Sequence, residues 1–373
     1  MAAVACSASP EAEYDPATLD TYLSALPAEA RLSADAPAAD VGSTGALTYG
    51  NTAALAVESA RFARSINAPA VQVVRTLRAI VQAPPSLYDS SKREFLWGPW
   101  DNEDGFGKLS LYIRQNEEGA DFHYSYALVR MVDGDLAEAT PVIWGAATPD
   151  PDDEDRGVGI TLWDVEANAA FEREHDPAFD ESAQHGSGRF VMLYGHHEEG
   201  EREALFNVAV FRNFVSDDAD AHEGPADLDY FYGRVLESND RRLDFFDSAI
   251  SADLCDATAD SCFENDSNAD APESLDFLAV FVDGGVGRAE ATVRDGDLAA
   301  PVSLVECWDA GFDRTFIRLE SGGSEVINAG ACAAPMDQSM SSLGLPSLST
   351  IDTDLLSALD CVAQHGVDSC SSQ

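Results

Sequence analysis

The chain has 373 residues, 45% of them hydrophobic, which is a globular composition and enough to build a core without help. It carries 67 acidic and only 22 basic residues, a formal net charge of −45, so it repels phosphate backbones and disfavours docking on anionic lipid. This charge excludes nucleic acid from the expected partners. It is typical of solubility in a salty medium, with a cation store or a partner with a basic face as the alternatives.

Residues 1–14 are expected to form a lipobox-like start and a polar tether. Cys6 follows Ala3-Val4-Ala5, a pattern that resembles the lipobox of bacterial lipoproteins, in which the cysteine is lipidated and becomes the first mature residue. Ala3 stands where Leu is usual, and the charged region of a signal peptide is missing, so we expect the true start to lie upstream of Met1. The alternative is a free thiol at Cys6. A lipid on Cys6 would anchor the protein to a membrane that it does not span, since no apolar run reaches about 18 residues.

Residues 15–90 are expected to be a helical segment of three amphipathic helices. The first has apolar residues at helical spacing between Leu19 and Leu26, and the second runs from a cap at Asn51 to Ile66. Pro69 then opens a third helix, which Pro84-Pro85 stops. Residues 1–90 have a net charge of only −4, which leaves −41 for residues 91–373. This change in charge marks a boundary near residue 90.

From about residue 91 to residue 334 the apolar period changes from helical to two, and we expect an antiparallel β domain. A helical insert at 165–171 interrupts it. The predicted strands are 95–97, 109–114, 122–132, 142–147, 157–163, 188–194, 205–211, 229–235, 242–246, 277–282, 289–294, 302–307 and 316–319. The predicted fold class is α+β, with the N-terminal helices packed on a large curved antiparallel sheet, an open barrel or a sandwich, and with a disulfide-stapled C-terminal region.

Residues 335–373 are Ser-rich, with one short helix predicted at 353–363. Apart from Cys6, all the cysteines lie in the last third of the chain, at Cys255, Cys262, Cys307, Cys332, Cys361 and Cys370. Their even number predicts three disulfides, and pairing of neighbours is the simplest of fifteen connectivities. There is no CxxC, and His365 is the one soft ligand nearby, which argues against zinc. Disulfides imply an oxidising compartment, so the protein is expected in the periplasm or at the cell surface.

The usual signatures of catalysis are missing, so no catalytic residue is predicted. The chain has no GxSxG elbow, HExxH, complete P-loop or Rossmann fingerprint. The segment His196-His197-Glu198-Glu199 is a candidate metal site provided that it lies in a turn spanning 194–201, with a solvated hairpin tip as the alternative. No cofactor is expected except calcium, for which the acidic loops 148–156 and 256–273 offer oxygen ligands, although neither loop fits an EF-hand. The aromatic run at 95–100 is expected to be buried, with carbohydrate stacking as the alternative.

Residues 94–332 resemble a family of uncharacterised lipoproteins of myxobacteria and related bacteria. The residues that carry the resemblance are Leu96-Trp97-Gly98-Pro99-Trp100, Arg156-Gly157-Val158-Gly159, Gly186-Ser187-Gly188 with Tyr194, Phe211-Arg212-Asn213-Phe214, Gly287-Arg288-Ala289 and Cys307-Trp308-Asp309. The resemblance implies an exported, β-rich lipoprotein, and it carries no activity and no catalytic residues.

The sequence therefore predicts an exported, lipid-anchored envelope protein that acts as a non-catalytic binding or structural module. One alternative is a carrier that holds a lipid or another apolar ligand in the curved sheet, which an enclosed apolar cavity would favour. The last alternative is an exported hydrolase, which would need two close carboxylates or a nucleophile–base pair in a cleft.

Overall fold

In the computed structural model, the described residues are 14–26, 52–102, 105–150, 157–180, 186–199, 202–215, 226–236, 242–252, 272–282, 285–296, 298–333, 336–338, 345, 348–351 and 353–365. The expected lipid anchor Cys6, together with Cys255, Cys262 and Cys370, lies outside them. So do most of the two acidic loops considered for calcium.

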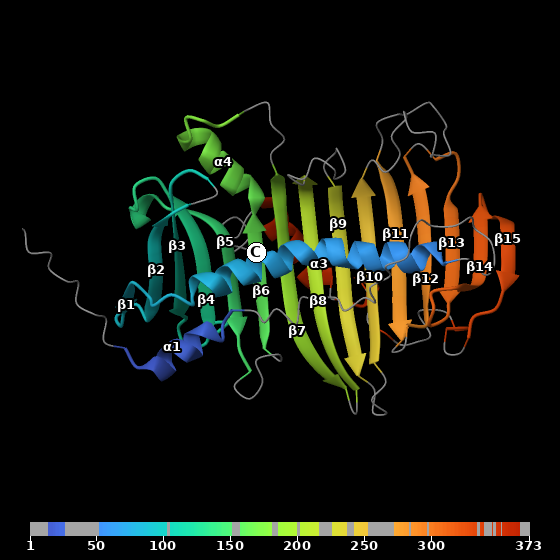
Figure 1. Ribbon diagram of the computed structural model, residues 1–373, viewed down its shortest axis with the longest axis horizontal. Helices are drawn as coiled ribbons and strands as arrows, with labels where there is room; N and C mark the ends of the chain where they lie inside the picture. The colour runs from blue at the N-terminus through green and yellow to red at the C-terminus, as the bar shows by residue number, and fades with distance from the viewer. Residues whose placement is uncertain are drawn as a thin grey trace, which may run out of the picture.

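The described part of the chain forms one antiparallel sheet in which each strand pairs with the next along the sequence (Figure 1). The sheet is not closed, and β1 and β15 are its two edges. The strands are β1 (Leu87–Asp89), β2 (Glu94–Asp101), β3 (Lys108–Gln115), β4 (Tyr124–Met131), β5 (Thr140–Thr148), β6 (Val158–Asp164), β7 (Ser187–Glu199), β8 (Arg202–Val215), β9 (Ala226–Leu236), β10 (Arg242–Ala252), β11 (Glu273–Val282), β12 (Gly287–Asp295), β13 (Val302–Trp308), β14 (Arg314–Ser321) and β15 (Ser324–Gly330). The expectation of a large antiparallel sheet is confirmed, whereas the barrel and sandwich alternatives are wrong.

Both faces of the central strands are buried, which explains their composition. In β8, Val208 and Val210 belong to a core cluster on one face, while Ala209 and Phe211 belong to a cluster on the other. Successive side chains of a strand point to opposite faces, so a strand that is covered on both sides carries apolar residues at consecutive positions. The sheet is therefore the middle layer of the fold, with helical segments on either side.

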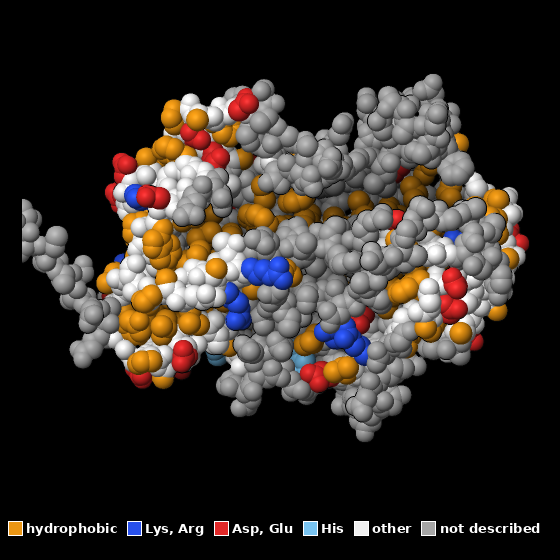
Figure 2. All heavy atoms as spheres, in the orientation of Figure 1, with side chains coloured by type: hydrophobic (Ala, Val, Ile, Leu, Met, Phe, Trp, Pro, Cys, Tyr) orange, Lys and Arg blue, Asp and Glu red, His pale blue; other side chains and the backbone are white. Residues whose placement is uncertain are grey.

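A single long helix, α3 (Ala54–Ile80), crosses one face of the sheet at a steep angle to the strands (Figure 1). Its first turns lie near β12 and β13, and α1 (Pro16–Leu23) lies beyond its last turns, against β3. Under the helix, the small side chains of Ala209, Ala279 and Ala289 belong to the same cluster as helix residues Ala56 and Val74. Hydrophobic side chains gather on this face along the helix (Figure 2).

The prediction of two helices separated near Pro69 is wrong, because α3 is continuous over 27 residues. A proline within a helix removes one backbone hydrogen bond and costs about 3 kcal/mol. Leu55 and Ala56 before Pro69, and Val71 and Val74 after it, are buried against the same face of the sheet. Burial of each of the larger side chains contributes about 1.5–3 kcal/mol, so their sum outweighs the cost of the proline.

The opposite face is crossed by the C-terminal segment, which returns from β13 toward β7. The disulfide Cys307–Cys332 fastens its start, and the guanidinium of Arg288 on β12 donates to the carbonyls of Met336 and Gln338. Further along, η3 (Leu348–Thr350) is held by the carboxylate of Asp247 on β10, and α5 (Thr353–His365) packs on β7 and β8. These contacts place α5 beside the site described below.

The remaining helix, α4 (Val165–His175), confirms the predicted insert and packs against β5 and β7. Its anchor is the buried Arg130 of β4. The guanidinium of Arg130 donates to Asn168 and to Glu172, and it lies 4.7 Å from the centre of the Phe171 ring. A short 3-10 turn, η1 (Leu136–Glu138), leads from β4 to β5.

The thirteen predicted strands coincide with β2 to β14, but β1 and β15 were not expected. β1 has three residues, and β15 is largely exposed, so neither carries a clear apolar alternation. β1 also begins inside the segment expected to be helical, while α1 and α3 of that segment pack on the sheet. The boundary that charge suggested near residue 90 thus falls between β1 and β2.

Candidate functional site

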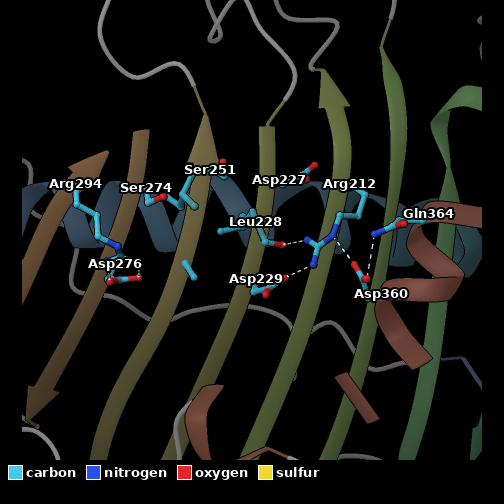
Figure 3. A pocket seen from close by; sticks show the side chains of 12 residues that line it. Arg212, Asp227, Leu228, Asp229, Ser251, Ser274, Asp276, Arg294, Asp360 and Gln364 are labelled. Atoms are coloured by element: carbon cyan, nitrogen blue, oxygen red, sulfur yellow. Dashed lines mark hydrogen bonds and ion pairs between the residues drawn. The ribbon is translucent and has the colours of Figure 1, made fainter. Parts of the chain in front are cut away.

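An open hollow of about 360 Å³ lies on the face of the sheet opposite to α3, beside α5 (Figure 3). Strands β8 to β12 form its floor and one side, and α5 forms the other side. Its lining residues are Arg212, Asp227, Leu228, Asp229, Ala249, Ile250, Ser251, Ser274, Asp276, Arg294, Asp360 and Gln364.

The sheet register sets the floor of the hollow. Asp229 of β9, Ala249 of β10 and Asp276 of β11 are direct neighbours across three adjacent strands. Neighbouring strands lie about 4.8 Å apart, so the Cα atoms of the two aspartates are separated by about 10 Å. Ala249 between them has only a methyl group, and this small side chain leaves the space that the hollow occupies.

Arg212 is fixed at one end of the hollow by all three of its guanidinium nitrogens. Its Nε donates to Asp360 at 2.6 Å, and its Nη2 donates to Asp229 at 2.7 Å. Its Nη1 donates to the carbonyls of Phe211 and Leu228. Burial lowers the pKa of Arg212, but the hydrogen bonds and charges of the two aspartates outweigh this effect and leave the pKa raised. Arg212 is therefore a permanent cation with a fixed orientation.

The other end of the hollow repeats the arrangement with Arg294 of β12, which forms an ion pair with Asp276. In Figure 3 the two arginine–aspartate pairs lie on either side of the hollow, with Ser251 and Ser274 along its upper edge. On α5, Gln364 donates to Asp360 at 3.0 Å, which holds the carboxylate that meets Arg212. The polar walls are thus preorganised by contacts within the protein.

The hollow offers mainly hydrogen-bond acceptors to a ligand. Four aspartates and two arginines line it, which gives a net charge of −2. All three guanidinium nitrogens of Arg212 already donate within the protein, so this arginine has little capacity left for an anion. A carboxylate has about four lone-pair positions, and those of Asp229 and Asp276 are filled only in part by arginine. A ligand rich in donors fits this environment.

The same residues do not form a hydrolytic centre. A general acid must carry a proton, whereas Asp229 and Asp276 both accept hydrogen bonds from guanidinium groups. Ser251 and Ser274 have no histidine or lysine among the residues that line the hollow with them, so neither has an activating base there.

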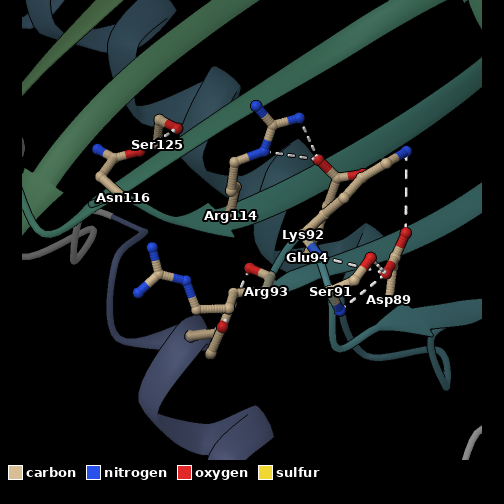
Figure 4. Close-up of polar contacts among 9 residues, drawn as sticks. Asp89, Ser91, Lys92, Arg93, Glu94, Arg114, Asn116 and Ser125 are labelled. Carbon is tan, nitrogen blue, oxygen red and sulfur yellow. Dashed lines mark hydrogen bonds and ion pairs between the residues drawn. The ribbon is translucent and has the colours of Figure 1, made fainter.

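A second polar cluster, at the hairpin of β1 and β2, has a structural role (Figure 4). The Asp89 carboxylate accepts from the backbone and hydroxyl of Ser91, which closes the hairpin turn. The backbone carbonyl of Arg93 accepts from the hydroxyl of Tyr22, which docks α1 on the sheet. Arg114 pairs with Glu94 across β2 and β3. These contacts account for the cluster without a ligand.

The histidine pair does not lie in the expected turn. Both residues are within β7, where His196 pairs with Leu205 and His197 with Ala204 of β8. The Nε2 atom of His196 lies 3.4 Å from a carboxylate oxygen of Glu203 on β8. In the described part of the chain, no group of three or more His, Cys, Asp or Glu side chains could hold a metal ion.

Among the cysteines, the pair Cys307–Cys332 is confirmed. Cys361 on α5 is also disulfide-bonded, and its expected partner Cys370 lies outside the described residues. In the aromatic run, Phe95 and Trp97 are fully buried, as expected, whereas 37% of Trp100 is exposed.

None of the residues of the hollow was predicted to belong to a site, although Arg212 is among the residues that carry the family resemblance. A signal was present, because Asp229 and Arg294 lie in predicted strands and Asp276 directly precedes one. Identifying them required the strand register and the position of α5, which are not visible in one sequence.

The chain matches no protein-family model, no curated protein and no solved structure. In the described part of the chain, no helix is both long enough and apolar enough to cross a membrane.

Proposed function

We propose that this protein is an exported, lipid-anchored envelope protein that acts as a non-catalytic binding module, and that the hollow beside α5 is its binding site. The observation that carries the proposal is the preformed hollow, whose walls are held by the arginine–aspartate pairs Arg212–Asp229 and Arg294–Asp276. Walls that are ordered before the ligand arrives reduce the entropic cost of binding.

Export and anchoring are supported by the cysteines. The Cys307–Cys332 disulfide is typical of an oxidising compartment, and the segment around Cys6 resembles a lipobox. The resemblance to myxobacterial lipoproteins agrees with the same location. The strongly acidic surface suits an exported protein that meets changing salt concentrations.

The two other function classes have weaker support. The hydrolase hypothesis needs a proton donor or an activated nucleophile, and the residues lining the hollow provide neither arrangement. The carrier hypothesis needs an enclosed apolar cavity, whereas this hollow is open and lined by charged side chains. On the α3 face, the region between helix and sheet contains large buried side chains such as Phe246 and Phe281.

A thermal-shift screen of small polar compounds tests the binding function. The wild-type protein is compared with Ala249→Leu, in which a larger side chain fills the floor of the hollow. We expect at least one compound to raise the Tm of the wild type and not that of the variant. If no compound in a panel of amines, sugars and amino acids has this effect, the proposal is wrong.

Export and anchoring need a separate experiment on protein expressed in a bacterial host with its native upstream sequence. Intact mass spectrometry with and without reduction should find a mature N-terminus at Cys6 with added acyl mass, together with disulfides. A non-acylated Cys6 would contradict the anchor without affecting the binding function.

A further inference from the structure

We propose that the hollow binds a linear diamine, with one ammonium group at Asp229, the other at Asp276, and the carbon chain across Ala249. This inference rests on the proposed function of the hollow as a binding site, and it adds the chemical class of the ligand.

The first argument is the balance of donors and acceptors. The guanidinium nitrogens of Arg212 all donate within the protein, and Arg294 is paired with Asp276, so unused hydrogen-bonding capacity resides mainly in carboxylate oxygens. An ammonium group has three donors and no acceptor, which complements such a site. A dicarboxylate or a phosphate would instead meet a net negative charge.

The second argument is the symmetry of the floor. The row Asp229–Ala249–Asp276 places one carboxylate on each side of an apolar methyl group. Methylene groups pack favourably on the alanine, while each ammonium end meets a carboxylate. A molecule with a single ammonium group occupies only one of the two ends.

The third argument is length. With standard bond lengths, the nitrogens of a four- or five-carbon diamine are about 6–8 Å apart when the chain is extended. A charge-assisted hydrogen bond of about 2.8 Å at each ammonium group adds to this length. The diamine and its two hydrogen bonds together then match the distance between carboxylates on β9 and β11, which are separated by one strand. A diamine of this length therefore reaches both aspartates without moving the strands.

The fourth argument is the difference between the ends. Asp227 and Asp360 lie near Asp229, so that end carries three carboxylates against one arginine, while the Asp276 end pairs one carboxylate with Arg294. Both carboxylates that contact the proposed ligand remain partly exposed, with side-chain exposures of 35% for Asp229 and 49% for Asp276. A ligand can therefore reach them without displacing the arginines.

Isothermal titration calorimetry of the full chain at moderate salt tests the proposal with 1,4-diaminobutane, 1,5-diaminopentane and the monoamine n-butylamine. We expect one diamine per chain, bound about tenfold more tightly than the monoamine, as the loss of one charged hydrogen bond predicts. Asp276→Asn should bind the diamines and the monoamine with about equal affinity. Ala249→Leu should bind none of the three amines. The Tm of each variant checks that it is folded.

The matched control is Asp133→Asn, which removes one negative charge from the turn that follows β4, outside the hollow. Its affinity and its diamine preference should equal those of the wild type. If Asp133→Asn weakens binding as much as Asp276→Asn, or if the wild type binds diamine and monoamine equally, diffuse attraction to an acidic protein explains the binding and the diamine proposal is wrong.

The thermal-shift screen separates this proposal from the proposed function. If diamines fail but another compound stabilises the wild type and not Ala249→Leu, the ligand class is wrong and the binding function stands. If diamines and the whole panel fail, both proposals are wrong.

Discussion

The carboxylate of Glu306 on β13 accepts a hydrogen bond of 2.6 Å from the backbone N–H of Leu55, across a sequence separation of 251 residues. Ala53 is the N-cap of α3 and has no side chain that could cap the helix. The sheet therefore supplies the cap that the helix lacks. Arg314 of β14 donates to the same carboxylate at 2.5 Å, and neither side chain of this ion pair is exposed.

Replacing Glu306 by Ala should destabilise the protein by about 3–5 kcal/mol, because the change leaves a buried guanidinium without its carboxylate and removes the cap of α3. Urea unfolding monitored by tryptophan fluorescence measures the loss. The matched control is Glu325→Ala on the exposed edge strand β15, which should change the stability by less than about 0.5 kcal/mol. A small effect at Glu306 would show that the helix is held by apolar burial alone.

The stability should also depend on pH through Asp247. Burial raises the pKa of Asp247, the hydrogen bond from the Leu348 N–H opposes this effect, and the charge of Asp276 adds to it. Because the folded-state pKa lies above the unfolded value, the folded protein binds more protons between the two values, and its stability falls as pH rises through that window. Asp247→Asn removes this contribution, since Asn has no titrating carboxyl.

The measurement is urea unfolding of both proteins in steps from below pH 4 to pH 7. The free energy of unfolding of the wild type relative to Asp247→Asn should fall as pH rises from about 4 and then become constant. A difference that grows with pH would mean that the Asp247 carboxylate is stabilised in its ionised form.

Features that depend on neighbouring residues in the sequence could be predicted, whereas contacts between distant segments could not. The period-two pattern predicted the positions of strands such as β8 and β11 correctly, although both faces of these strands are buried and their apolar residues are therefore consecutive. It did not predict that β13 would cap α3 through Glu306. That contact depends on which strands lie under the helix, and a local pattern does not contain this information.

Pro69 illustrates the opposite error, in which a local rule was applied too strictly. The rule that proline starts or ends a helix describes an isolated segment, whereas α3 is held by the sheet on both sides of Pro69. The hollow was missed for a related reason. Ala249 is unremarkable in sequence and becomes informative only when its neighbours on β9 and β11 are known to be aspartates.

Loss of the Cys307–Cys332 disulfide should lower the stability by about 3 kcal/mol, since the bond closes a loop with a sequence separation of 25. The double replacement Cys307→Ala with Cys332→Ala should also increase amide exchange in α5, because the C-terminal segment then keeps only non-covalent contacts with β12, β10 and β8, such as those of Arg288, Asp247 and Arg212. Hydrogen–deuterium exchange compares the variant with the oxidised wild type. Unchanged exchange in α5 would mean that its contacts with β7 and β8 suffice.

Salt should stabilise this protein. With 67 acidic and 22 basic residues, repulsion between carboxylates opposes the compact state, and at an ionic strength of about 0.15 M it is screened beyond about 8 Å. Salt also weakens the exposed ion pairs such as Lys108–Asp101, but such pairs contribute about 0–1 kcal/mol each. The Tm should therefore rise from low to moderate NaCl and rise equally in KCl. A Tm that does not change with salt would mean that the negative charges are too far apart, or too well paired with arginine, to destabilise the fold.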